Sequence, residues 1–148
     1  MNSAITPNEL YQRYPNIVTS LANLINDEAL QKLPSTLTHL IRLRASQLNN
    51  CKFCQAMHIE EALKAGESQE RVDAVSTWLD STLFNKQEQQ ALAWTETLTL
   101  LHAETDVTLQ FNNTLSVFGE QNLVALTSII LQINSWNRIA MGLGFNNN

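Results

Sequence analysis

The sequence predicts an all-α domain: a compact bundle of about eight helices, formed by residues 1–148 as one unit. Three observations favour this fold class. Glycine and proline are scarce, with four and three in 148 residues, whereas all-β folds need many turns. Apolar residues make up 44% of the chain, which is enough for the core of one domain. They also recur at steps of three and four residues, the period of a helix face.

Two short helices are expected near the N-terminus. Thr6 followed by Pro7 predicts the start of the first, over residues 8–14, because a threonine cap and a proline in the first turn both favour helix initiation. Asn16 is the expected cap of the second helix, whose apolar residues continue at helical spacing to Ile25.

The next two helices contain the residues of chemical interest. Pro34 predicts the start of a helix over residues 34–50, which ends at a pair of asparagines because asparagine tolerates left-handed backbone geometry. A fourth helix is expected over residues 51–65. Gly66 follows it, as glycine often does at the C-terminal end of a helix.

Four further helices are expected in the second half of the chain. They cover residues 69–80, 86–105, 107–118 and 120–143. Ser68 is placed to cap the first of them, and Gly119 separates the last two. Residues 127–133 could form a strand, but the three-to-four spacing on either side favours helix.

Composition and charge exclude several classes of partner. The net charge is -5, and no basic block is present, so a nucleic-acid partner is not expected. The N-terminus lacks the pattern of a secretory signal, and polar residues interrupt the apolar stretches, so a cytoplasmic protein without membrane contact is expected. In a reducing compartment, a CxxC pair is more often catalytic or metal-binding than structural.

The stretch SQLNNCKFCQAMH contains both cysteines and one of the three histidines. On a helix, where each residue turns by about 100°, Cys51, Cys54 and His58 fall within a sector of roughly 60°. Unpaired N–H groups and the dipole at the start of a helix favour a thiolate. His58 is placed to exchange a proton with Cys54, and Glu61 is placed to orient His58.

Three interpretations of this cluster compete. The pair could be two unrelated core cysteines, or half of a zinc site that uses His58 and either His39 or His102. Structural zinc needs four ligands, and the chain has no second CxxC. The surroundings are also unlike thioredoxin, because no βαβ pattern is present. A dithiol redox couple on a helical scaffold, with no metal and no bound cofactor, is the interpretation we favour.

Residues 35–140 resemble the AhpD-like alkylhydroperoxidase group, within the wider carboxymuconolactone decarboxylase family. The pattern in that group is Ser-Gln-x-Asn, then CxxC, then a histidine four residues later. The matching residues here are Ser46, Gln47, Asn49, Cys51, Cys54 and His58. The stretches ALAWTETLTL and INSWNRIA also resemble segments common in these proteins.

The resemblance implies an all-α fold in a homo-oligomer, often a trimer or hexamer, that reduces a hydroperoxide substrate. Cys54 would be the attacking thiolate, Cys51 the resolving thiol and His58 the base. A dithiol reductant, such as the lipoyl group of a protein, would restore both thiols. The founding decarboxylase branch of the family works without this cysteine pair.

One position departs from the family pattern. The family's proton relay carries a glutamate twelve residues before the first cysteine, and this chain has His39 there. His39 could act as a relay because the pKa of histidine is near neutral, but it cannot supply the negative charge of a carboxylate. We expect altered, weaker peroxidase activity, with Glu61 as a possible replacement carboxylate.

The function expected from the sequence is therefore that of an antioxidant enzyme, a thiol-dependent peroxidase or disulfide reductase. One alternative is a decarboxylase or isomerase of small lactone acids, which would need a cationic pocket and would survive loss of both cysteines. The other is a redox-sensing oligomer whose disulfide changes assembly without turnover.

Five other side chains are assigned structural roles. Glu96 is expected to form a salt bridge with Arg42 or Arg138, and His102 is expected to be a capping or surface residue. The aromatic residues Phe53, Trp94 and Trp136 are expected in the core or in a subunit interface, rather than around a pocket.

Overall fold

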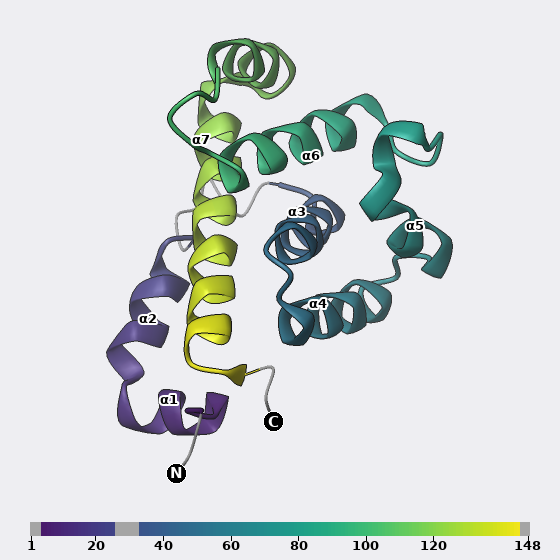
Figure 1. Ribbon diagram of the computed structural model, residues 1–148. Helices are drawn as coiled ribbons and strands as arrows, with labels where there is room; N and C mark the ends of the chain where they lie inside the picture. Colours follow the sequence, from purple (N-terminus) through teal and green to yellow (C-terminus); the bar gives the residue numbers. More distant parts are fainter. Residues whose placement is uncertain (1–3, 26–32, 146–148) are drawn as a thin grey trace.

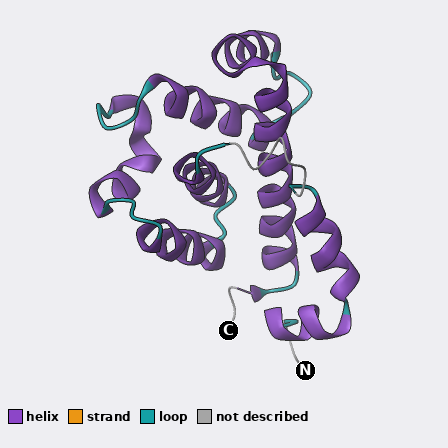
Figure 2. Cartoon of the chain, turned by 180° about the vertical axis from the view of Figure 1, so that it is seen from behind, coloured by secondary structure: helices purple, strands orange, loops and turns teal. Residues whose placement is uncertain are grey.

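The computed structural model describes residues 4–25 and 33–145, and this part of the chain contains helices and loops but no strand (Figures 1 and 2). Its elements are α1 (Pro7–Arg13), α2 (Pro15–Asn23), α3 (Ser35–Leu48), α4 (Lys52–Lys64), α5 (Gln69–Ala74), the 3₁₀ helix η2 (Val75–Asp80), α6 (Lys86–Thr99) and α7 (Thr108–Gly142). The predicted all-α class is confirmed, and residues 127–133 are helical as favoured.

Local capping signals explain where most of these helices begin. Thr6 accepts a hydrogen bond from the N–H of Glu9, whose side chain accepts one from the N–H of Thr6, so a capping box starts α1 as expected. Ser68 caps α5 as expected, because its side chain accepts a hydrogen bond from the N–H of Arg71. The predicted cap Asn16 is wrong: Pro15 occupies the first position of α2, because its fixed φ suits the first turn, and Asn16 lies inside the helix.

Two of the expected helices in the second half of the chain have different bounds in the structure, and the expected break at Gly119 is confirmed. The helix expected over residues 86–105 ends at Thr99, because the following residues form polar turns in which His102 and Thr105 hydrogen-bond to each other. The helix expected over residues 69–80 divides into α5 and η2. Gly119 has a φ of 76° and breaks α7 into the two helical segments that the sequence predicts.

Helix α3 lies at the centre of the fold, against α4, α6 and α7 (Figure 1). One core cluster joins α3 to α6 and α7, and a second joins α3 to α4, α5, η2 and α6. A third, smaller cluster surrounds the cysteines, and its buried members are Leu10, Cys51, Cys54, Ala140 and Phe145. The CxxC motif therefore lies where α1, the start of α4 and the end of α7 meet.

Helix α7 is long and apolar enough to cross a membrane by length and composition, which the sequence interpretation did not expect. Its inner side packs against α2, α3 and α6. That side carries Gln132 and Asn137, which are buried and hydrogen-bonded within the fold. A core helix of a soluble protein satisfies the same criteria of length and composition.

Candidate active site

The two cysteines form a disulfide at the N-terminus of α4, with their Cα atoms 5.2 Å apart. Cys51 is the N-cap residue, so it lies just before the first turn rather than within it, and Cys54 is the third residue of the helix. The Sγ atom of Cys51 accepts a hydrogen bond from the backbone N–H of Cys54 at 3.3 Å. Both side chains are buried, at 0% and 2% exposure.

A polar network fixes the turn that leads into this motif. Asn50 has a φ of 54°, the left-handed geometry expected of the asparagine pair, and the N–H of Cys51 donates to the carbonyl of Ser46. The buried side chain of Asn137 on α7 donates to Ser46 Oγ at 3.0 Å and accepts from Asn49 Nδ2 at 2.9 Å. Through these contacts, Ser46 and Asn49 of the Ser-Gln-x-Asn run attach the turn to α7.

His58 lies one turn after Cys54, and its ring is 5% exposed. Its Nδ1 is 3.0 Å from Glu61 Oε2, as expected if Glu61 orients the ring. Burial lowers the pKa of His58 below its ordinary value, although the hydrogen bond and the charge of Glu61 oppose that shift. The neutral ring then donates from Nδ1 to Glu61, which leaves the lone pair on Nε2. Among the described residues, Nε2 has no hydrogen-bond partner, so it is free to accept a proton.

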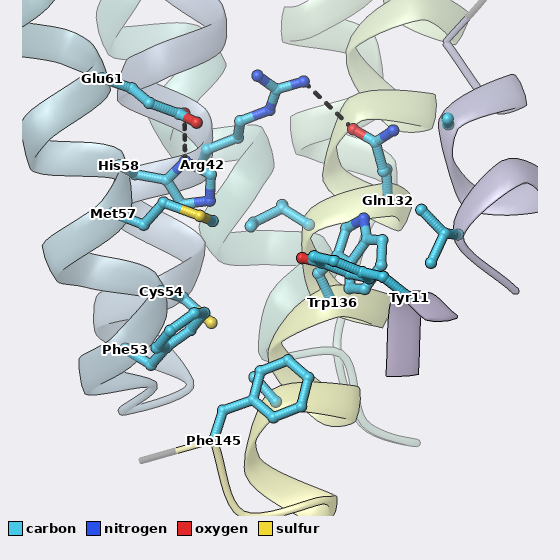
Figure 3. A pocket seen from close by; sticks show the side chains of 14 residues that line it. Tyr11, Arg42, Phe53, Cys54, Met57, His58, Glu61, Gln132, Trp136 and Phe145 are labelled. Carbon is cyan, nitrogen blue, oxygen red and sulfur yellow. Dashed lines mark hydrogen bonds and ion pairs between the residues drawn. The ribbon is translucent and has the colours of Figure 1, made fainter. Parts of the chain in front are cut away.

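Cys54 and His58 line the same cavity, of about 280 Å³ (Figure 3). Its apolar walls are Tyr11, Phe53, Met57, Trp136 and Phe145, and its polar groups are Arg42, His58, Glu61 and Gln132. In Figure 3, Arg42, Glu61 and Gln132 lie toward one end, and Cys54, Phe53 and Phe145 lie toward the other. The cavity can therefore hold a small, mainly apolar molecule beside a sulfur atom and a base.

Two of the four predicted catalytic residues do not line this cavity. Cys51 is fully buried behind Cys54. His39 lines a neighbouring cavity of about 240 Å³ with Arg42 and Thr38, and its buried Nδ1 has no partner among the described residues. Burial and the charge of Arg42 both lower the pKa of His39. His39 in turn lowers the pKa of His58 slightly through its own charge, so the two histidines interact electrostatically.

Arg42 is a pocket residue that the sequence interpretation missed. The salt bridge expected for Glu96 is present, but its partner is Arg44, at 2.7 Å from Nε to Oε1, and not Arg42 or Arg138. Arg42 instead donates from Nη2 to Gln132 Oε1 at 3.2 Å. The spacing did contain a signal, because Arg42 lies three residues after His39 and four before Ser46, on the face that leads to the cysteines.

The aromatic residues divide between core and pocket. Phe53 and Trp136 line the cavity, contrary to the expectation, and Trp94 is buried in the core as expected. His102 is an exposed residue in the turn after α6, as expected. In the part of the chain that the structure describes, no three His, Cys, Asp or Glu side chains are grouped to hold a metal ion.

The chain matches a known family over more than half of its length. Residues 14–97 match the model of the carboxymuconolactone decarboxylase family. The uncharacterized protein YdfG of Bacillus subtilis is 35% identical over 109 residues, which cover 74% of each chain. The uncharacterized protein Rv2313c of Mycobacterium tuberculosis is 28% identical over 117 residues, and these cover 78% of this chain but 40% of that protein.

A solved structure shares the whole fold. The crystal structure of ATU0492 from Agrobacterium tumefaciens superposes with a TM-score of 0.82 at 32% identity, and the match covers 94% of this chain and 95% of that one. ATU0492 is described as a protein of unknown function, with a suggested role in antioxidant defence of the AhpD type.

Proposed function

The chain belongs to the carboxymuconolactone decarboxylase family and has an AhpD-like fold, and on that basis we propose that it is a thiol-dependent peroxidase. Its substrate would be an organic hydroperoxide, reduced at the cost of two thiols. One observation carries the proposal: Cys54, bonded to Cys51, lines a mainly apolar pocket together with His58 Nε2, which has no hydrogen-bond partner among the described residues. A dithiol couple, an adjacent base and a cavity for an organic molecule are the parts that this reaction needs.

The proposed reaction begins with both cysteines reduced. His58 takes the proton of the Cys54 thiol, and the thiolate attacks the terminal oxygen of the hydroperoxide. The O–O bond breaks, the alkoxide leaves as an alcohol with the proton from His58, and Cys54 becomes a sulfenic acid. Cys51 then attacks the sulfur of Cys54, which forms the disulfide and releases water. A dithiol reductant, for example a lipoyl group, returns two electrons and two protons to the pair.

The order of the two cysteines rests on access. Cys54 lines the cavity, whereas Cys51 does not, so a hydroperoxide in the cavity meets Cys54 first. The position of Cys51 at the N-cap suits the second step, because N–H groups at a helix start favour the thiolate that attacks the sulfenic acid. His39 lies outside this cavity but shares Arg42 with it, and we propose that it influences His58 indirectly rather than as a direct relay.

We also propose that the enzyme works in the cytoplasm as a homo-oligomer of the whole chain. The reducing compartment supplies the dithiol that the cycle needs. An exposed apolar surface formed by α7 and the end of α6 supports self-association.

Thiol chemistry tests the proposal directly. The reduced protein, Cys51→Ser and Cys54→Ser are each mixed with an equimolar amount of cumene hydroperoxide, and intact mass and free thiols are followed with time. We expect rapid loss of both thiols in the parent, and a trapped sulfenic acid in Cys51→Ser but not in Cys54→Ser. Thiols that react no faster than free cysteine would rule out the peroxidase. Oxidation that changes assembly without continued peroxide consumption would indicate a redox sensor.

The position of Arg42 favours a second candidate function, decarboxylation of a small lactone acid. A decarboxylase of small lactone acids needs a cationic pocket, and Arg42 supplies a positive charge in the cavity. Such an activity does not use the thiols, so it would persist in a variant with both cysteines replaced by serine. Turnover of a lactone acid in that double variant would favour the decarboxylase over the peroxidase.

A further inference from the structure

The guanidinium of Arg42 is a part of the pocket that the thiol reaction does not use. Among the described residues it forms no ion pair, and its side-chain hydrogen bond there goes to Gln132 Oε1. The partly buried Arg44 and Arg71 contrast with it, because each lies 2.7 Å from a glutamate oxygen. A guanidinium has five N–H donors in a fork that matches a carboxylate, so most of the binding capacity of Arg42 is open to a ligand.

The neighbours of Arg42 hold it in place without neutralising it. Gln132 donates from Nε2 to the carbonyl of Leu21 at 2.8 Å, which turns its Oε1 toward Arg42. Glu61 also lines the pocket and its charge acts on Arg42, but its hydrogen bond goes to His58 and its side chain is 45% exposed, so water screens that charge. Arg42 is half-buried, and among the described residues no carboxylate pairs with it directly, so a bound anion would be stabilised there.

We propose that Arg42 binds the carboxylate of an acidic organic hydroperoxide, whose apolar body lies along the pocket and whose peroxide group reaches Cys54. Arg42 and Cys54 line the same cavity but lie toward opposite ends of it, with apolar side chains between them (Figure 3). Its volume of about 280 Å³ fits a small acid. The inference rests on the proposed peroxidase function and names its substrate class.

A matched pair of substrates tests the assignment. The second-order rate constant kcat/KM is measured for para-carboxycumene hydroperoxide and for its methyl ester, which differ in charge and little in shape. We expect the wild-type protein to prefer the acid by about 30-fold or more, the effect of a buried charge pair. In Arg42→Gln the ratio should fall to within about threefold of one, and Arg42→Lys should keep part of the preference. The control Arg138→Gln, an exposed arginine outside this cavity, should keep the wild-type ratio.

Binding of an unreactive analogue separates this inference from the peroxidase proposal. The affinity of the oxidised protein for para-isopropylbenzoate and its methyl ester is measured through the fluorescence of the pocket tryptophan. Binding of the acid that is lost in Arg42→Gln supports the carboxylate site even if no variant consumes peroxide. Peroxide turnover without preference for the acid overturns the site and leaves the peroxidase standing. Failure of the wild-type protein to bind the acid more tightly than its ester also overturns it.

Discussion

At the scale of single residues, the environment of His58 controls the proposed proton transfer. The ring is buried, which lowers its pKa and keeps it neutral near pH 7. Glu61 partly offsets this effect through a hydrogen bond to Nδ1, and that bond also fixes the orientation of the ring. We propose that Glu61, on the same helix as His58, supplies the carboxylate that the family resemblance leads one to expect at position 39.

Replacement of Glu61 by glutamine should therefore change the pH profile as well as the rate. Because Glu61 raises the pKa of His58, its loss should lower that pKa further and move the acid limb of kcat/KM to lower pH. The rate should fall less than in His58→Gln, where we expect a loss of about 100-fold or more. Glu60→Gln is the control, because Glu60 pairs with Lys64 on the surface. An unchanged acid limb in Glu61→Gln would contradict the role assigned to this carboxylate.

The same buried ring predicts how stability depends on pH. The unfolded chain protonates His58 near its ordinary pKa of 6.5, whereas the folded protein resists protonation until the pH is lower. Below about pH 6.5 the unfolded state therefore binds more protons, and the free energy of unfolding falls as the pH decreases toward the lowered folded value. Urea midpoints at about pH 7.5 and about pH 5.5 measure this loss. His58→Gln should lose less between the two pH values than the parent, and an equal loss would contradict the prediction.

At the scale of elements, Gly119 decides the shape of α7. It adopts a φ of 76° and a ψ of 167°, which are unfavourable for a residue with a side chain. A Cβ atom at Gly119 would meet nothing within 4 Å, and the same is true at Gly142, whose φ is not in the left-handed region. The two glycines therefore differ in backbone conformation and not in steric room.

Alanine at each position isolates that difference. Gly119→Ala should reduce the free energy of unfolding by about 1–3 kcal/mol, the cost of a strained backbone conformation. Gly142→Ala, at the last residue of the helix, should be neutral or slightly stabilising. Denaturant titrations of both variants measure the effect. Equal stability of the two would mean that the break at Gly119 is not a backbone requirement.

The elements also show why some boundaries could be predicted and others could not. Thr6, Ser68 and Gly119 act through their own backbone and near neighbours, so the sequence alone indicates these starts and breaks. The early end of α6 depends on competing turns over residues 100–106, in a stretch whose apolar spacing still suits a helix. Where a helix and a turn are close in free energy, tertiary packing determines where the helix ends, and local sequence patterns do not reveal that packing.

At the scale of the whole molecule, some residues of the site could be placed from local helix geometry, and others are brought there only by the packing of distant helices. Cys51, Cys54, His58 and Glu61 lie within one stretch of helix, so helical geometry alone could place them together. The other half of the pocket comes from α1, α2, α3 and the C-terminal half of α7 with the residues that follow it. The contact between Arg42 and Gln132 joins residues 90 positions apart, and only the packing of α3 against α7 creates it. Sequence reasoning therefore placed Cys54, His58 and Glu61 together and missed that Arg42 lines the same pocket.

Self-association is the remaining expectation at this scale. The outer side of α6 and α7 carries an apolar surface, the α6–α7 surface, whose exposed members are Leu101, Phe111, Val124 and Leu131. Two hollows of about 370 and 250 Å³ lie on it and share Thr127 and Leu131. Exposed apolar patches on a small protein are typical of association sites.

We therefore expect a homo-oligomer, a trimer or a hexamer, that uses the α6–α7 surface. Leu131 is 54% exposed and borders both hollows, so Leu131→Lys should place a charge in the interface and lower the mass measured by sedimentation toward that of a monomer. Leu79→Lys is the matched control, because Leu79 is 75% exposed, lies on η2, which packs against α3 and α5, and borders neither hollow. A monomeric parent, or an oligomer that persists in Leu131→Lys and dissociates in Leu79→Lys, would show that the α6–α7 surface is not the interface. Leu131 does not line the pocket that contains Cys54, so dissociation in Leu131→Lys should leave the reaction of Cys54 with peroxide measurable in the monomer.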